Sequence, residues 1–300
     1  MQVKANGIRI EVEDTAADSS QTGAPVVLLI MGLGMQLVAW PAAFVRSLVE
    51  QGLRVVRFDN RDIGLSQHLD HLRVPNVAWE SLKFRIGLPV KPPYTLQDMA
   101  GDALGVLDAL GIAQAHVVGV SMGGMIGQRM ALAAPQRVLS LCSVMSSSGA
   151  RHLPGPTAQA LRALLRRPKR ADEQALVEHY IRLFKVIGSP GFPFDEGMLR
   201  DHVLAATRRS FHPAGMLRQM TAIAADSRRA KELAQIKAPT LVMHGKDDPL
   251  VPFACGADTA RRIGGARLVG IHGMGHDLAP GVVAHLLEAL VPHIRCACPA

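Results

Sequence analysis

The stretch Gly119-Val120-Ser121-Met122-Gly123 follows the apolar run Ala115-His116-Val117-Val118 and precedes a segment of helical character. This pattern predicts a strand, a tight turn and a helix, with Ser121 at the apex of the turn. Such a turn strains the serine backbone and brings strand and helix so close that the residues two before and two after the serine must lack side chains. Gly119 and Gly123 meet that demand. The unpaired N–H groups of the helix N-terminus favour a developing negative charge, so we predict that Ser121 is a nucleophile.

Apolar runs suited to buried strands alternate with helical segments on both sides of this turn. The predicted strands are residues 26–31, 54–59, 115–120, 138–145, 240–245 and 266–271, and the predicted helices are 40–51, 96–110, one ending before Pro135, 255–263 and 282–293. Asn6-Gly7, between strand-like residues of the segment 3–12, predicts a type I′ hairpin, and residues 60–95 are expected to be a long loop. This order indicates an α/β fold with a mostly parallel, twisted sheet covered by helices on both faces.

The alternation stops between residues 146 and 236, where only helical segments fit. One helical face carries the apolar side chains Leu176, Tyr180, Leu183, Phe184 and Ile187. Active sites of open α/β sheets lie at the carboxyl ends of the strands, so a helical insertion there is expected to form a lid. We therefore expect a core made of residues 1–145 and 237–300, with residues 146–236 as a helical cap.

Composition is that of an ordinary globular protein, with 48% hydrophobic and 19% charged residues. The formal net charge of +8 suggests anionic partners, and basic residues cluster at Arg162, Arg166, Arg167, Lys169 and Arg170. These residues alternate with leucines at helical spacing and have no aromatic platform beside them. We interpret them as a solvated helix face and expect no nucleic-acid partner.

The N-terminal residues lack the apolar segment of a signal peptide, and no run reaches the roughly 18 apolar residues of a membrane span. We therefore expect a soluble, cytoplasmic protein. Its four cysteines, Cys142, Cys255, Cys296 and Cys298, have neither C-x-x-C spacing nor partnering histidines. Reduced thiols are expected, with Cys296 and Cys298 in a frayed C-terminal tail whose role the sequence leaves open.

A serine hydroxyl needs a base to take its proton, and that base needs a carboxylate to hold it in one tautomer. Asp247 and Asp248 directly follow the predicted strand 240–245. The candidate bases His272 and His276 follow the last predicted strand in a glycine-rich loop. The order of serine, acid and base along the chain is that of α/β-hydrolases.

Together, the segments 119–123, 245–252 and 273–277 resemble the α/β-hydrolase superfamily, and the resemblance covers nearly the whole chain. Within the superfamily, residues 29–34, 58–66 and 188–196 resemble a branch of carboxylesterases that includes aclacinomycin methylesterase-like enzymes. The resemblance implies that the acid lies three residues after the strand-ending glycine, which favours Asp248 over Asp247. It also implies that the base occupies the Gly-x-Gly-His position, which favours His276 over His272.

The oxyanion of the reaction needs two fixed N–H donors. One is expected from Met122, the residue after the nucleophile, and the other from the loop after the first long strand. The family resemblance places the second donor at Leu33. The chain departs from the usual His-Gly of this loop by carrying Met31-Gly32, so the hydrogen bond with which that histidine would brace the loop is missing.

A second departure is Arg61-Asp62, where the resembling family usually has Arg-Gly. The charged run Asp59-Asn60-Arg61-Asp62 could be mistaken for a metal cluster, but its place in the family pattern is structural. We expect neither metal nor cofactor.

The predicted function is hydrolysis of a small-molecule carboxylic ester with an apolar acyl or alcohol part. Perhydrolases, C–C bond hydrolases, thioesterases and aminopeptidases use the same machinery and remain open, as do chain length and oligomeric state. A non-catalytic small-molecule receptor is the alternative of another class. A serine at the turn argues against dehalogenase and epoxide hydrolase chemistry, which in this superfamily uses an aspartate there.

Overall fold

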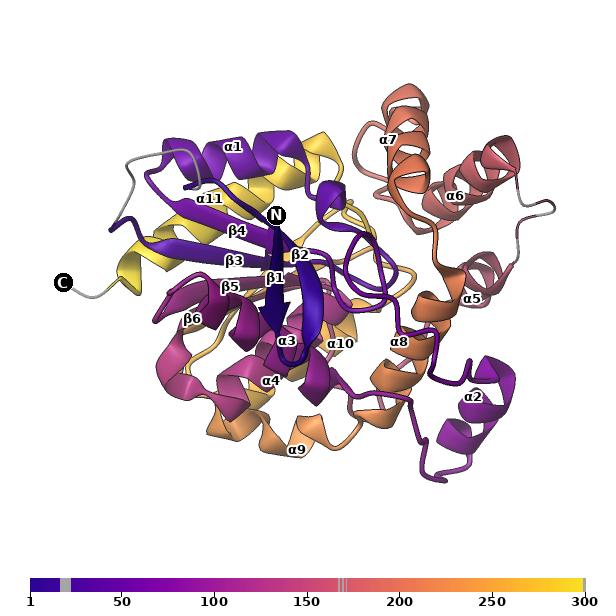
Figure 1. Cartoon of the computed structure of the whole chain (residues 1–300), viewed down its shortest axis with the longest axis horizontal. Coiled ribbons are helices and arrows are strands. Elements are labelled where there is room, and N and C mark those ends of the chain that lie inside the picture. The colour runs from indigo at the N-terminus through magenta and orange to yellow at the C-terminus, as the bar shows by residue number, and fades with distance from the viewer. Residues whose placement is uncertain (17–22, 167, 169, 171, 299–300) are drawn as a thin grey trace.

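The computed structural model describes residues 1–16, 23–166, 168, 170 and 172–298 (Figure 1). Its eight-stranded sheet has the order β1-β2-β4-β3-β5-β6-β7-β8. The strands from β3 to β8 pair in parallel, and β1 and β2 pair antiparallel at one edge. The strands are β1 Gln2–Ala5, β2 Ile8–Asp14, β3 Val26–Ile30, β4 Arg54–Phe58, β5 Ala115–Val120, β6 Val138–Val144, β7 Thr240–Gly245 and β8 Arg267–Ile271. The predicted mostly parallel sheet is confirmed.

Asn6 and Gly7 connect β1 and β2 with φ values of 47° and 82°, as the predicted type I′ hairpin requires. Two helices, α1 Ala42–Glu50 and α11 Pro280–Cys296, cover one face of the sheet. The other face carries α3 Leu96–Ala109 and α4 Met122–Ala133, with α10 Phe253–Arg262 packed beside β7 (Figure 1).

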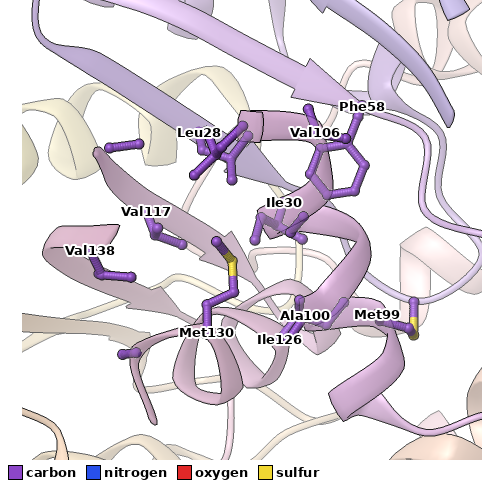
Figure 2. Packing of buried hydrophobic residues seen from close by; sticks show 14 of the residues in the cluster. Leu28, Ile30, Phe58, Met99, Ala100, Val106, Val117, Ile126, Met130 and Val138 are labelled. Carbon is purple, nitrogen blue, oxygen red and sulfur yellow. The ribbon is translucent and has the colours of Figure 1, made fainter. Parts of the chain in front are cut away.

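Strand β3 contributes side chains to the hydrophobic cores on both faces of the sheet. Successive side chains of a strand point to opposite faces. Leu28 and Ile30 pack in the core beneath α3 and α4, as Figure 2 shows, whereas Val27 and Leu29 join the core beneath α1 and α11. Every residue of β3 is buried, which explains its uninterrupted apolar sequence.

Between residues 146 and 236, the described part of the chain contains helices and no strand. These are α5 Ala158–Leu165, α6 Glu173–Ile187, α7 Glu196–Arg209, α8 Pro213–Ala225, α9 Arg229–Glu232 and the 3₁₀ helix η3 Leu233–Gln235. In Figure 1, α5 to α8 lie together to one side of the sheet. The remaining short 3₁₀ helices are η1 Leu37–Ala39 and η2 Pro135–Arg137.

Two expectations were wrong. The segment between β4 and α3 is not a loop throughout, because it contains helix α2 Val77–Arg85, which is capped by the Asn76 side chain and packs beside α8. Its apolar residues form no stripe, and Trp79 and Leu82 are exposed, so helical periodicity gave no signal.

The last helix also extends further than expected. Helix α11 continues through Pro292 to Cys296, and the Cys298 Sγ lies 3.6 Å from Nε2 of the buried His116. All four cysteines are unpaired thiols. Among the described residues, no helix has the length and apolar character needed to cross a membrane.

Candidate active site

The turn between β5 and α4 has the geometry that its sequence predicts. Ser121 lies at φ 55° and ψ −118°, a left-handed conformation that costs energy for a residue with a side chain. A Cβ on Gly119 would lie 2.2 Å from the carbonyl oxygen of Gly123. A Cβ on Gly123 would lie 2.0 Å from the carbonyl oxygen of Ile30. Both glycines are therefore required by close backbone approach, and the half-buried Ser121 sits at the first turn of α4.

The structure brings Ser121, His276 and Asp248 together. His276 Nε2 lies 3.1 Å from Ser121 Oγ, and His276 Nδ1 lies 2.7 Å from Asp248 Oδ2. The three residues come from the loops after β5, β7 and β8, which meet at the carboxyl edge of the sheet. Both histidine nitrogens thus have partners in the order that a proton transfer from serine to histidine needs.

Asp248 is buried and held from several sides. Its Oδ1 accepts hydrogen bonds from the N–H groups of Leu250 and Val251, and His244 Nε2 lies 3.5 Å from Oδ2. Burial alone would raise the pKa of Asp248, but the neighbouring His276, His244 and the Val251 N–H hold it well below its usual range. The carboxyl group is therefore ionised at neutral pH.

The rival candidates have other partners. Asp247 Oδ2 accepts the N–H of Gly273, 2.8 Å away, and so braces the loop that carries His276. The His272 side chain lies 2.9 Å from Lys246 Nζ. Neither the Asp247 nor the His272 side chain takes part in the hydrogen bonds that connect Ser121, His276 and Asp248.

The loop after β3 lies directly against Ser121. A Cβ on Gly32 would be 3.2 Å from the Ser121 Cβ, which places the next residue, Leu33, beside the serine. Within the described part of the chain, the backbone N–H groups of Leu33 and Met122 donate no hydrogen bond to the protein. Both are thus available to a ligand atom near Ser121.

The sequence did not reveal how the histidine loop is fixed. The His276 N–H donates to the Ile187 carbonyl at 2.6 Å, and the Gly275 N–H donates to Ser189 Oγ at 2.9 Å. Ser189 Oγ in turn donates to Asp277. The end of α6 therefore holds this loop. The family-like segment 188–196 was the available signal, but its contact could not be read from the sequence.

The charged run after β4 makes ion pairs. Asp59 pairs with Arg209, and Asp62 accepts two hydrogen bonds from Arg218 at 2.8 and 2.9 Å. Arg61 pairs with Asp102 of α3. These contacts support the structural interpretation of the run. Asp62 adopts φ 71°, the conformation for which the family usually uses glycine.

His68, Asp70 and His212 are residue types that can bind a metal ion, and their possible ligand atoms lie within 4.8 Å of one another. His212 also contacts the Asp62 carbonyl of the charged run. The two imidazole rings are stacked with an interplanar angle of 3°, so their in-plane lone pairs run side by side instead of converging. Asp70 Oδ1 lies 2.9 Å from His212 Nε2 and 3.9 Å from the Arg218 guanidinium. The cluster therefore fits a hydrogen-bonded contact between the loop after β4 and the start of α8 better than it fits a metal centre.

The basic cluster of the sequence falls partly outside the described residues, which exclude Arg167 and Lys169. Arg162 and Arg166 line a hollow of about 530 Å³ between α5 and α6. Two further cations of this hollow are paired, Lys185 with Glu196 and Arg182 with Glu178.

Comparison with known proteins identifies the class. Residues 25–279 match the sequence profile described as the α/β hydrolase fold, and the chain belongs to this family. It is 32% identical to rhodomycin D methylesterase of Streptomyces peucetius over 90% of this chain and 91% of the relative. The corresponding enzyme of Streptomyces sp. strain C5 is 33% identical with the same coverage. These relatives agree with the methylesterase branch that the sequence resembles.

A putative carbamate hydrolase of Variovorax paradoxus is 28% identical over 83% of each chain. Among solved structures, the enol-lactonase of Burkholderia xenovorans LB400 aligns with a TM-score of 0.69 and 23% identity, covering 98% of this chain and all of that one. A meta-cleavage product hydrolase of Pseudomonas fluorescens IP01 aligns with a TM-score of 0.75 and 18% identity, covering 99% and 98%. These two structures agree with the α/β-hydrolase fold.

Proposed function

We propose that the protein is a serine hydrolase of carboxylic esters that works through an acyl-enzyme intermediate. The observation that carries the proposal is the continuous set of contacts from Ser121 to His276 to Asp248 at a strained turn. The methylesterase relatives favour an ester as the substrate class. No cofactor is needed for this chemistry.

In the first half-reaction, Ser121 Oγ attacks the ester carbonyl while His276 Nε2 takes the hydroxyl proton. The carbonyl oxygen becomes an oxyanion, which the N–H groups of Leu33 and Met122 stabilise. His276 then gives its proton to the departing alcohol, leaving an acyl group on Ser121. In the second half, His276 takes a proton from water, whose oxygen attacks the acyl group, and returns it to Ser121 as the carboxylic acid leaves. Asp248 holds His276 in the required tautomer and stabilises its charged form.

We further propose that residues 146–236 form a cap over this site, inserted into a core of residues 1–145 and 237–300. The proposal is supported by contacts with loops at the carboxyl ends of several strands. Arg209 reaches the loop after β4, Thr157 donates its N–H to the Pro249 carbonyl after β7, and Ser189 meets the loop after β8. A cap in this place supplies walls for the substrate.

A hydrolysis panel tests the proposed reaction. The panel contains methyl and aryl esters of differing acyl length, together with amides, thioesters, a carbamate, a peracid assay and a vinylogous diketone with a cleavable C–C bond. We expect multiple turnovers on esters with kcat/KM at least about tenfold above every other class, because relatives of the same branch are named for methyl ester cleavage. Preference for another class would replace the ester in the proposal. Stoichiometric acylation without turnover would indicate a receptor.

The cap proposal predicts a change in selectivity at Met216 of α8. A Cβ on Gly34 would lie 3.1 Å from the Met216 Sδ, so this half-buried side chain lies against the loop that carries Leu33. We expect Met216→Ala to change the ratio of kcat/KM between small and bulky esters by about 3–30-fold, since apolar wall contacts are worth roughly 1–2 kcal/mol. Reactivity toward a small fluorophosphonate should change much less.

The matched control for this prediction is Met198→Ala. Met198 is the same residue type on the neighbouring helix α7, and its side chain is exposed. If both variants leave the ratio of kcat/KM between small and bulky esters unchanged, the residues around Met216 do not form a wall of the substrate site.

A further inference from the structure

The loop that carries Leu33 lacks the histidine that the resembling family usually has there, and two side chains from other parts of the chain hydrogen-bond to its backbone. Asn60 Nδ2 donates to the Met31 carbonyl at 2.9 Å. Gln219 Oε1 accepts the N–H of Gly34 at 2.9 Å. The second contact joins residues 185 positions apart in the chain and comes from α8, inside the segment that we propose as the cap.

These two hydrogen bonds act on the peptide groups on either side of one central peptide. The Met31 carbonyl belongs to the peptide between residues 31 and 32, and the Gly34 N–H belongs to the peptide between residues 33 and 34. The peptide between them carries the Leu33 N–H. Gly34 has φ 68°, and residues 32 and 34 are both glycines, which allow the backbone many conformations. Fixing both neighbouring planes therefore restricts the direction of the Leu33 N–H.

Gln219 is itself held firmly. Its side chain is fully buried, and its Nε2 donates to the Arg61 carbonyl at 3.0 Å, so both ends of the amide have partners and its orientation is defined. The preceding residue, Arg218, is buried and makes a double hydrogen bond with Asp62. A buried pair of this kind keeps α8 in a fixed position against the loop after β4.

We propose that Gln219 is a positioning residue for the oxyanion hole, and that through it the cap helix α8 sets the direction of the Leu33 N–H. This inference rests on the proposed ester hydrolysis. Gln219 touches no reacting atom. It acts through the Gly34 peptide, whose fixed orientation keeps the donor where the oxyanion develops, and preorganised donors of this kind stabilise the transition state more than the substrate.

Gln219→Met tests the proposal because it keeps the approximate volume and removes both hydrogen bonds. Loss of one complete oxyanion donor lowers kcat about 10²–10³-fold, so a misdirected donor should lower it about 10–100-fold. KM should stay within about threefold. The affinity for a boronic acid inhibitor, whose tetrahedral adduct needs the oxyanion hole, should fall by a factor similar to that of kcat.

Gln128→Met is the matched control. Gln128 is also a fully buried glutamine with two side-chain hydrogen bonds, but these join it to Ser143 of β6 and Arg229 of α9, not to the loop after β3. Its substitution is expected to lower thermal stability while leaving kcat and boronic acid affinity within about threefold. A purely structural role for Gln219 would make the two variants behave alike, and that result would overturn the inference.

Gln219→Leu keeps the test decisive if the Met variant does not fold. Leucine also removes both the acceptor of the Gly34 N–H and the donor to the Arg61 carbonyl, so kcat and boronic acid affinity are expected to fall as in the Met variant. Wild-type kcat and boronic acid affinity in a folded Gln219→Leu protein would overturn the inference. Absence of ester turnover in the wild type would instead refute the proposed function, so the two failures are distinguishable.

Discussion

Ser121→Ala is expected to lower kcat for ester hydrolysis by about 10⁴-fold or more while leaving the fold intact. In the proposed mechanism, the hydroxyl is the group that forms and breaks the acyl bond, and removal of the serine nucleophile lowers kcat by about 10⁶-fold in an unrelated serine hydrolase. The contacts that shape the turn use the Ser121 backbone, whose N–H donates to the Val144 carbonyl and whose carbonyl accepts from Ser146 Oγ. Alanine retains both. Initial rates and thermal unfolding of the purified variant measure the two effects.

Ser140→Ala is a suitable control because it also deletes a buried hydroxyl, one whose partner is His116 within the sheet. Its activity should stay within a few-fold of wild type. A fluorophosphonate should label the wild type once per chain at Ser121. Retention of activity by Ser121→Ala, or labelling at another residue, would move the reaction away from this turn.

The strand and turn elements of the site could be predicted because local rules determine them. Strand β5 begins and ends at the predicted residues, and the Gly119 and Gly123 positions follow from steric exclusion within a five-residue stretch. Short-range geometry of this kind is encoded by neighbours in the chain. The parallel pairing of the strands from β3 to β8 likewise follows from the alternation of apolar runs and helical segments.

The supporting contacts could not be predicted in the same way. Gln219 of α8 and Ser189, just after α6, reach loops of the candidate site from segments far away in the sequence. Nothing in the sequence showed which loop either side chain would contact. Buried polar side chains gain their role from the three-dimensional partner that satisfies them. The same reasoning applies to Asp62, which departs from the family pattern and finds its explanation in Arg218.

The second large loss of kcat is expected from substitution of Asp248. We expect Asp248→Asn to lower kcat about 10⁴-fold, because an amide can present an N–H to His276 Nδ1 and so favour the wrong tautomer of the imidazole. The pKa of Asp248 lies below its usual range, so the wild-type carboxylate remains charged throughout the working pH range. The Asn side chain of the variant has no carboxyl group to ionise, so raising the pH should not restore its activity. The lowered pKa also stabilises the fold above the unfolded-state pKa of about 3.9, and this contribution is lost as the pH falls through the folded-state pKa.

Asp247→Asn is the matched control, since it makes the same change at the adjacent loop position. The Asn side chain keeps an oxygen that can accept the Gly273 N–H, and Asp247 does not contact His276, so kcat should change by less than about tenfold. Initial rates of both variants at one neutral pH separate the roles, because only Asp248 contacts His276. The opposite ranking of the two variants would assign the orienting carboxylate to Asp247, and it would require the loop after β7 to adopt a different conformation during the reaction.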